Sequence, residues 1–275
     1  MATLRQIKDK QQSVSTINKI TKAMQLVSSA KSQKAVKEMR DYKDYFNKVQ
    51  RIMSELVKEV KSEEKAYKGT YWILVMSDLG LAGGYNSNII KTTLANLKPE
   101  DKIVVLGNKG MSFARKQEKK AEWYSINEIL EGQLLAQIIT RIHAAYYDEK
   151  MEVKVVYTEY ISQMEFEPKL KQVLPIEPIE LSEEEKIEVD SVIEFEPNKE
   201  DLLVQLEDLY LQSLIVGIYK EAQASEHTAR KNAMENATNN GNELLQALSI
   251  EYNRGRQAKI TQEISEIIGG AESIK

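Results

Sequence analysis

Few side chains in this sequence could do chemistry. The chain has two histidines, His143 and His227, and no cysteine. Disulfides, thiol catalysis and cysteine-ligated metals are therefore excluded, and two histidines cannot build a histidine-rich metal site. Carboxylate pairs such as Glu183 and Glu185 fall in a solvated acidic stretch. We therefore expect no catalytic residue, no metal site and no cofactor.

A glycine-rich segment, residues 77–86, is the strongest candidate for a binding loop. It follows an apolar run, residues 71–76, and precedes a helix-forming segment, residues 87–97. Strand, glycine loop and helix is the order that phosphate-binding loops use. This segment matches neither GxGxxG nor GxxxxGK[ST], and its one acidic residue, Asp78, precedes the glycines. We therefore favour the structural use of these glycines in tight turns and in close packing of a helix on a strand.

A basic face on residues 3–61 is the second candidate. Its members are Lys19, Lys22, Lys31, Lys34, Lys37 and Arg40. Such a face could bind nucleic acid, but no aromatic residue is interleaved with it before Tyr42. A solvated face, or one that meets an acidic protein, is the interpretation we favour.

Two long helices are expected at the ends of the chain, because all five prolines lie between residues 99 and 197. Residues 3–61 repeat apolar or small side chains every seven positions, and residues 199–268 repeat them at spacings of three and four. At about 1.5 Å per residue the second helix would reach roughly 100 Å, so it needs a partner helix or a surrounding channel. Polar or small residues occupy its central core positions: Gln223, His227, Arg230 and Gly241.

Charge also favours pairing of the two helices. Residues 1–61 carry 14 Lys+Arg against 6 Asp+Glu, a net charge of +8. Residues 200–275 carry 7 against 12, a net charge of −5. Opposite charges would favour an antiparallel pair over self-association of either helix, although each surface ion pair contributes only about 0–1 kcal/mol.

The middle of the chain predicts a mostly parallel sheet with covering helices. The expected strands are residues 71–76, 102–106, 123–126 and 153–161, and the expected helices include 87–97 and 128–147. Residues 163–201 hold 13 Asp+Glu and read as a connector, with short strands at 173–176 and 192–195. The predicted fold class is α/β, a Rossmann-like central domain with a long antiparallel coiled coil. The predicted domains are 1–61, 69–198 and 199–275. No apolar run is expected to span a bilayer, and no signal peptide is expected.

Four stretches together carry a resemblance to a known family. Residues 20–31 begin ITKAM, and residues 77–88 read SDLGLAGGYNSN. Residues 224–238 read ASEHTARKNAMENAT, and residues 252–264 read YNRGRQAKITQEI. Over its full length the chain resembles the gamma subunit of rotary F-type ATP synthases. Leu79, where many relatives carry a basic residue, and Gly255, where alanine is common, depart from the family pattern.

This resemblance implies a central stalk without a catalytic nucleotide site. The terminal helices would form an antiparallel coiled coil inside a ring of alpha and beta subunits. The α/β domain would meet the epsilon subunit and the membrane ring of c subunits. Rotation driven by ion flow would then change the affinities of the catalytic beta subunits in turn. The chain would be a non-catalytic subunit at the cytoplasmic face of the cell membrane, with no membrane insertion and no nucleic acid partner.

The resemblance also implies site residues. Contact and torque transmission are expected at Thr21, Lys22, Ala23, Met24, Arg254, Arg256, Gln257, Thr261, Gln262 and Glu263. Packing or capping within the coiled coil is the alternative for each. A family motif on the α/β domain, whose role stays open, comprises Asp78, Gly80, Gly83, Gly84 and Asn86.

Three other functions are open alternatives at this point. The chain could be the shaft of a related rotary ATPase that uses hydrolysis for mechanical work. It could be a nucleotide-binding α/β enzyme with helical arms. It could also be a coiled-coil scaffold that binds nucleic acid through residues 1–61.

Overall fold

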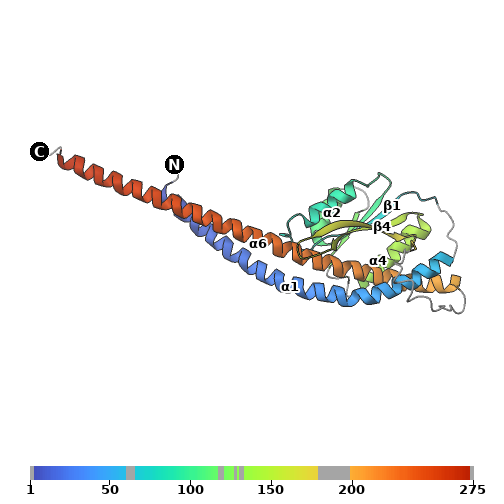
Figure 1. The fold of residues 1–275 in the computed structure, drawn as a ribbon. Coiled ribbons are helices and arrows are strands. Elements are labelled where there is room, and N and C mark those ends of the chain that lie inside the picture. The colour runs from blue at the N-terminus through green and yellow to red at the C-terminus, as the bar shows by residue number, and fades with distance from the viewer. Residues whose placement is uncertain are drawn as a thin grey trace. The chain divides into compact units, whose positions relative to one another are not determined.

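The chain forms two compact units, in a computed structural model that describes residues 3–59, 66–116, 121–126, 129, 133–178 and 199–272. Unit 1 comprises residues 1–28 and 231–275, and unit 2 comprises residues 29–230. Two helices run without a break through both units, α1 (Leu4–Glu59) and α6 (Lys199–Glu272) (Figure 1). The two long predicted helices are therefore confirmed. The division into three sequence domains stays a prediction.

Unit 2 contains a five-stranded sheet with the strand order β3-β2-β1-β4-β5. The strands are β1 (Thr70–Val75), β2 (Lys102–Leu106), β3 (Ala121–Tyr124), β4 (Glu152–Tyr160) and β5 (Phe166–Leu174). The first four pair in parallel and β5 pairs antiparallel with β4. The predicted α/β class and mostly parallel sheet are confirmed. Apolar runs such as Trp72–Val75 fit such a sheet, because its strands are buried on both faces.

Helices cover both faces of this sheet. The shorter ones are α2 (Tyr85–Leu94), η1 (Asn108–Gly110), α3 (Met111–Lys116), α4 (Gln133–His143) and the π-helical turn η3 (Ala144–Asp148). Alternate residues of β1 point to opposite faces. One face packs with α4 and with the parts of α1 and α6 that belong to unit 2, for example at Ile73, Leu56 and Leu214. The other face packs with α2 and α3, for example at Leu74 and Ile89.

The helices α1 and α6 are antiparallel in each unit. In unit 1 the Asn18 amide donates to Asn242 Oδ1 over 2.6 Å, and the hydroxyls of Thr21 and Thr238 lie 2.9 Å apart. In unit 2 the hydroxyls of Ser32 and Thr228 lie 2.7 Å apart. The residue numbers of the contacts on α6 therefore fall as those on α1 rise, as they do in an antiparallel pair.

Two glycines of α6 are helical and approach α1 closely in unit 1. A Cβ atom at Gly241 would lie 2.6 Å from Asn18 Oδ1, and one at Gly255 would lie 3.1 Å from Leu4 Cδ2. Gly255 therefore does not interrupt the helix. It allows a close approach of the helices, as Gly241 does.

One prediction for the middle of the chain is wrong. Residues 163–178 are more than a connector, because residues 166–174 form the nine-residue strand β5. A tight turn joins it to β4, with the N–H groups of Ile161 and Ser162 donating to the carbonyl of Glu165. β5 reads as polar because it is an edge strand with one exposed face, where Pro168 is also tolerated. The strand predicted at 192–195 lies outside the described residues.

Two further expectations need adjustment. Within the predicted helix 128–147, the described helical parts are a 3-10 residue at Ile129, the helix α4 and the π-helical turn η3. One helix among the described residues, within 201–268, is long and apolar enough to cross a membrane by length and composition alone. Its most apolar window has a mean hydropathy of 1.2 and is 44% buried. Leu211, Leu214 and Ile218 of α6 belong to the core of unit 2, so core packing accounts for much of this apolar character.

Candidate functional site

The loop between β1 and α2, residues 76–84, begins at the carboxyl end of the sheet and carries the family motif. Asp78 fixes its base. One carboxylate oxygen accepts from the backbone N–H groups of Asn108, at 2.8 Å, and Ile126, at 3.3 Å. The other accepts from Ser125 Oγ at 2.9 Å. These partners follow β2 and β3, so one carboxylate ties together the ends of three parallel strands.

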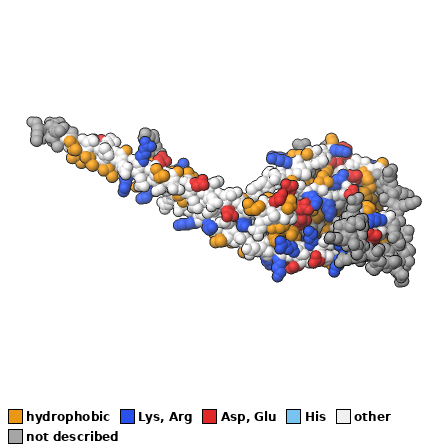
Figure 2. Space-filling view, in the orientation of Figure 1, with side chains coloured by type: hydrophobic (Ala, Val, Ile, Leu, Met, Phe, Trp, Pro, Cys, Tyr) orange, Lys and Arg blue, Asp and Glu red, His pale blue; other side chains and the backbone are white. Residues whose placement is uncertain are grey.

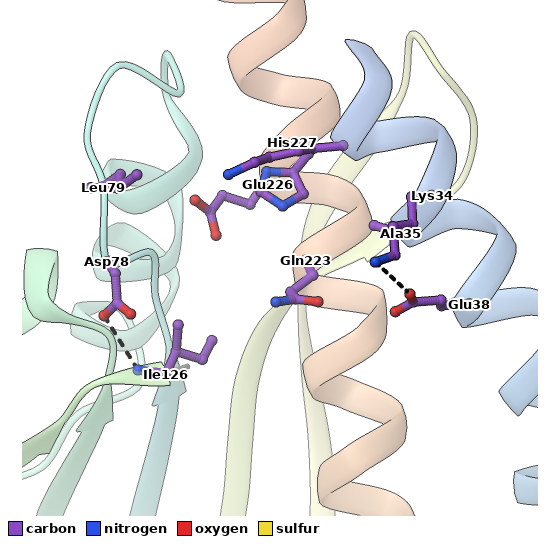
Figure 3. A pocket seen from close by; sticks show the side chains of 10 residues that line it. Lys34, Ala35, Glu38, Asp78, Leu79, Ile126, Gln223, Glu226 and His227 are labelled. Atoms are coloured by element: carbon purple, nitrogen blue, oxygen red, sulfur yellow. Dashed lines mark hydrogen bonds and ion pairs between the residues drawn. The ribbon is translucent and has the colours of Figure 1, made fainter. Parts of the chain in front are cut away.

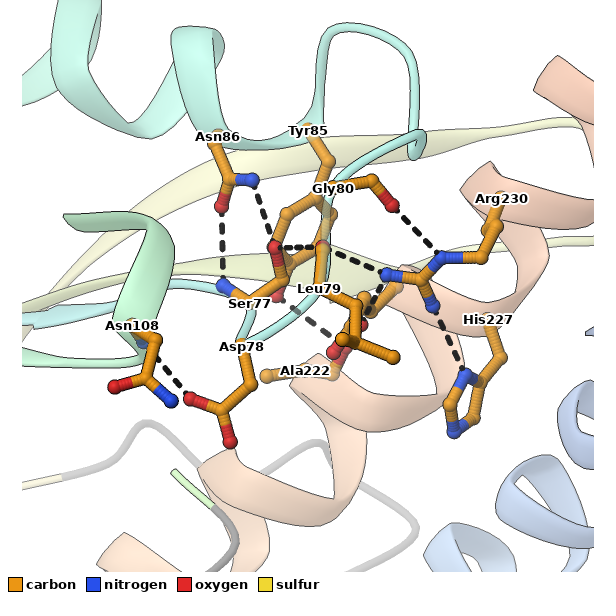
Figure 4. A network of polar contacts seen from close by, with 11 residues as sticks. Ser77, Asp78, Leu79, Gly80, Tyr85, Asn86, Asn108, Ala222, His227 and Arg230 are labelled. Atoms are coloured by element: carbon orange, nitrogen blue, oxygen red, sulfur yellow. Dashed lines mark hydrogen bonds and ion pairs between the residues drawn. The ribbon is translucent and has the colours of Figure 1, made fainter. Parts of the chain in front are cut away.

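Asn86 closes the loop from its helical side. Its Oδ1 atom accepts from the Ser77 N–H at 3.0 Å, and its amide donates to Ser77 Oγ at 2.7 Å (Figure 4). Inside the loop, Leu81 and Gly83 have positive φ angles of 64° and 59°. Glycine adopts this conformation easily, and a leucine there is strained. Side-chain hydrogen bonds therefore hold a loop conformation that Leu81 alone would disfavour.

Arg230 of α6 contacts the same loop. Its Nε donates to the Gly80 carbonyl at 3.0 Å, and its Nη2 donates to the Leu79 carbonyl at 2.9 Å (Figure 4). Nη2 also lies 2.5 Å from Glu226 Oε1, one helical turn away. We call Arg230, Glu226 and these two carbonyl groups the Arg230 clamp. Its guanidinium is buried, with 5% of the residue exposed.

A cavity of about 270 Å³ opens beside the clamp in unit 2. Figure 3 shows Gln223, Glu226 and His227 of α6 on one side and Asp78 and Leu79 of the loop on the other. α1 adds Lys31, Lys34, Ala35 and Glu38. Both charge signs line this cavity, so it has no clear preference for an anion or a cation.

Burial shifts the pKa values of two titratable groups at the cavity. It raises the pKa of Glu226, and Arg230 opposes that rise. Burial, together with the positive charges of Arg230 and Lys31, lowers the pKa of His227 to about 4. His227 is therefore an uncharged imidazole at neutral pH. This suits a packed histidine, since a general acid or base works best with a pKa near the operating pH.

The loop geometry favours a structural use over phosphate binding. The N–H groups of Asn108 and Ile126, which could face an anion, already donate to Asp78. A phosphate placed there would also meet the carboxylate charge of Asp78. Among the described residues no group of three or more His, Asp and Glu could hold a metal ion.

The predicted contact residues on α1 form a short patch in unit 1. Lys22 and Ala23 are exposed, while Thr21 and Met24 are partly covered. Thr21 donates to the Asn18 carbonyl and meets Thr238 across the helix pair. Lys22 Nζ donates to Gln25 Oε1 over 3.1 Å. Thr21 therefore serves packing within the pair, whereas Lys22 and Ala23 face outward.

The predicted contact residues on α6 all face outward in unit 1. Exposed side chains are those of Arg254, Arg256, Gln257, Thr261, Gln262 and Glu263. Their contacts are local to the helix, such as Gln262 Nε2 to Glu266 Oε1 at 2.8 Å and Lys259 Nζ to Glu263 Oε1 at 3.6 Å. Nothing in the described part of the chain covers these groups.

The two predicted contact sets do not come together. Thr21 meets Thr238, whereas residue 255 already lies against Leu4, near the start of α1. Sixteen residues of helix separate Thr238 from Arg254, about 24 Å at 1.5 Å per residue. The two sets are therefore distinct surfaces of unit 1.

Exposed apolar side chains accompany both sets. On α1 of unit 1 they are Ile17, Ile20, Leu26 and Val27, and on α6 they are Leu244, Ile250, Ile260, Ile264, Ile267 and Ile268. Figure 2 shows hydrophobic side chains gathered along unit 1 next to the grey C-terminal residues. Exposed apolar surface of this extent indicates a protein partner.

The Arg230 clamp is the feature that we did not predict from the sequence as a unit. A partial signal existed, because His227 and Arg230 occupy core positions of a helix where apolar residues are expected. Leu79 and Arg230 are 151 positions apart, so nothing in the sequence pairs them.

Comparisons with known proteins agree on one family. The family described as "ATP synthase" matches residues 3–274. An ATP synthase gamma chain of Mesoplasma florum is 39% identical over 237 residues, covering 83% of each chain. One of Mycoplasma mycoides is 40% identical over 234 residues, covering 81% of this chain and 80% of the relative.

Solved structures agree in fold. A chain in the Euglena gracilis mitochondrial ATP synthase, in a structure of OSCP, F1 and c-ring, superposes with a TM-score of 0.73 at 18% identity. The alignment covers 98% of this chain and 94% of that one. A chain from the central stalk and c-ring of the Tetrahymena thermophila enzyme gives a TM-score of 0.56 at 21% identity, covering 79% of this chain and 99% of that one.

Proposed function

Because this chain belongs to the ATP synthase family, whose curated members among its relatives are named gamma chains, we propose that it is the central rotor shaft of an F-type ATP synthase. It couples rotation of the membrane c-subunit ring, driven by ion flow, to conformational cycling of the catalytic beta subunits. The chain is a subunit of that membrane-bound complex and is itself non-catalytic. It sits at the cytoplasmic face of the cell membrane, held there through the complex.

The observation that carries this proposal is the make-up of the helix pair in unit 1. Its interface holds the hydrogen-bonded pair Asn18–Asn242, the hydroxyl pair Thr21–Thr238 and a close approach at Gly241. Large apolar side chains such as Ile20, Leu26 and Ile264 point outward. A coiled coil built for its own stability buries apolar residues at nearly all core positions and exposes polar groups. Here the buried Ile7, Met234 and Leu248 share the interface with polar pairs, while other large apolar side chains are exposed. A thin pair with an apolar exterior supports a shaft turning inside a surrounding ring.

The partners follow from this arrangement. Unit 1 contacts the alpha and beta subunits of the catalytic ring, through Thr21–Met24 on α1 and through 254–263 on α6. Unit 2 contacts the epsilon subunit and the ring of c subunits. A contact on the shaft then changes the conformation of a distant nucleotide site on a beta subunit. Because two separate sites are coupled in this way, the coupling is allosteric.

Arg256, Gln257 and Gln262 are proposed to transmit torque. Their side chains are exposed and carry a charge or an amide, so they can form directional hydrogen bonds to the ring. Replacing all three with alanine should leave assembly intact and lower coupled ATP turnover roughly tenfold, equal to about 1.4 kcal/mol or one hydrogen bond to a charged group.

A control triple of exposed unit 2 residues, Lys91, Asn96 and Arg115, all changed to alanine, should keep normal turnover. Turnover is measured on the purified complex, and assembly is measured by recovery of beta subunits with the tagged chain. Normal turnover in an intact Arg256–Gln257–Gln262 variant would remove the proposed role of these side chains.

Partner identity is tested by isolating the tagged chain from its native cells in mild detergent and identifying the bound proteins by mass. Alpha, beta, epsilon and c subunits together support the rotor assignment. ATP synthesis by the complex in vesicles under an imposed ion gradient then supports the synthase direction. Recovery of nucleic acid in place of these subunits would contradict the proposal.

A further inference from the structure

The glycine-rich loop and the Arg230 clamp have no role in the function described so far. The loop is fixed to the sheet at its base, because Asp78 holds the ends of β2 and β3 and Asn86 holds Ser77. The clamp fixes the same loop to α6 through Gly80 and Leu79. A chain of directional contacts therefore links the carboxyl edge of the sheet to α6.

Other polar contacts join the same stretch of α6 to the body of unit 2. The hydroxyl of Tyr85, at the start of α2, donates to the Ala222 carbonyl over 3.3 Å (Figure 4). Ser225 Oγ donates to the Thr158 carbonyl of β4 over 3.0 Å. Polar contacts to the body therefore sit at 222, 225 and 230 of α6, with Arg230 the last residue of unit 2.

Apolar packing alone would hold α6 against the sheet less specifically. Hydrophobic contacts are non-directional, so a helix can turn or slide on them at modest cost. Hydrogen bonds from a planar guanidinium to two carbonyls and a carboxylate are directional and lost after small displacements. Burial of the clamp strengthens this effect, because water cannot replace the lost partners.

We propose that the Arg230 clamp is the joint that fixes the angular position of α6 in the α/β body of unit 2, so that torque passes between body and helix without slip. This rests on the proposed rotor function and adds a positioning residue to it. The role of Arg230 is to keep the two parts of unit 2 turning as one.

The test measures coupling, not turnover alone. The complete complex is reconstituted in vesicles with the chain carrying Arg230→Gln, and ions pumped per ATP hydrolysed are measured. ATP turnover of the complex should stay near the wild-type rate, whereas the pumping ratio should fall roughly two- to thirty-fold, the range seen for mutations along coupling networks. Arg115→Gln removes one positive charge from an exposed site on α3 and should leave the ratio unchanged.

Two further variants separate the joint from simple loss of fold. Arg230→Lys keeps the charge but cannot fork to two carbonyls and a carboxylate, so its ratio should fall between those of wild type and Arg230→Gln. Glu226→Gln keeps the shape and removes the charge beside Arg230, and should also lower the ratio. If Arg230→Gln fails to assemble, these two variants decide the question.

The chain has no cysteine, so Met164→Cys gives one attachment point at the tip of the β4–β5 turn, where Met164 is 85% exposed. A bead fixed there should lag or slip under load in the Arg230→Gln complex and not in the wild type. Wild-type ratios in every clamp variant that retains turnover would overturn the proposed joint while leaving the rotor function intact. A wild-type chain that never assembles with alpha and beta subunits would instead overturn the rotor function itself.

Discussion

His227 lies half-buried on α6 between two positive charges, those of Arg230 and Lys31. The Arg230 guanidinium is 3.4 Å from His227 Nδ1. A second positive charge on the imidazole would be disfavoured by burial and by both neighbours. Because His227 is neutral, it does not repel the Arg230 guanidinium, which pairs with the Glu226 carboxylate.

Replacing His227 with glutamine should change how stability depends on pH. The pKa of His227 is about 4 in the folded chain against an ordinary value of 6.5, so the unfolded chain binds more protons between these values. The wild type should therefore lose stability as pH falls from 6.5 toward 4, by about 1–2 kcal/mol relative to His227→Gln once solvent screening is allowed for.

Urea unfolding of both chains at neutral and acidic pH measures this difference. Both chains share the acidic groups near His227, including Glu226, Asp78 and Glu38, so the effect of their titration on stability cancels in the comparison. Equal loss of stability in the two chains on acidification would show that His227 does not titrate in this way.

At the scale of elements, α1 and α6 of unit 1 pair through small and polar side chains as well as through the buried Ile7, Met234 and Leu248. The Asn18 amide donates to Asn242 Oδ1 over 2.6 Å directly beside Gly241, where a side chain would collide with Asn18. A polar pair at such a position specifies which residues meet, at some expense in stability. The same two residues therefore contribute more to alignment than to the strength of the pair.

A double-mutant cycle on Asn18→Ala and Asn242→Ala should give a coupling energy of about 0.5–1.5 kcal/mol, the value of one hydrogen bond. Asn236 is exposed on α6, so Asn18→Ala with Asn236→Ala should be additive within about 0.5 kcal/mol. Free energies of unfolding in urea provide both numbers. Additivity in the Asn18–Asn242 cycle would mean that this hydrogen bond contributes nothing measurable.

Some of these elements could be predicted from sequence and some could not. The long helices follow from the absence of proline, and β1, β2 and β4 follow from apolar runs that are buried on both faces. β5 escaped prediction because its edge position leaves it polar and tolerant of Pro168. The Arg230 clamp escaped because its partners outside α6 are backbone carbonyls, which carry no residue identity, and because the loop after β1 is distant from α6 in the chain.

At the scale of the whole molecule, the chain ends carry opposite net charges, yet charged contacts between α1 and α6 do not simply follow them. Lys220 of α6 pairs with Glu38 of α1 at 3.7 Å, which places the acid on the basic helix. Most charged side chains of unit 1 are exposed, as the interspersed blue and red groups in Figure 2 show. Long-range attraction between the helices is therefore strongly screened in salt.

Raising the NaCl concentration from about 0.1 M to about 1 M shortens the Debye length from ~10 Å to ~3 Å. The free energy of unfolding of the chain should then change by less than about 1 kcal/mol, as expected for exposed pairs. Thermal or urea unfolding at the two concentrations measures this. A loss of several kcal/mol would show that charge attraction, and not packing and hydrogen bonding, holds the two helices together.

The antiparallel pairing also sets an order of events during synthesis. Asn18 must wait for Asn242, which is made 224 residues later, and Thr21 must wait for Thr238. Until then the first helix leaves the ribosome before its partner is made, with Ile7, which the finished chain buries, still uncovered. Contacts this distant in sequence form late and leave apolar surface open to aggregation. α1, which is translated long before the second half of α6, is thus among the last elements to reach its final environment, and a chain released before residue 238 could not complete unit 1.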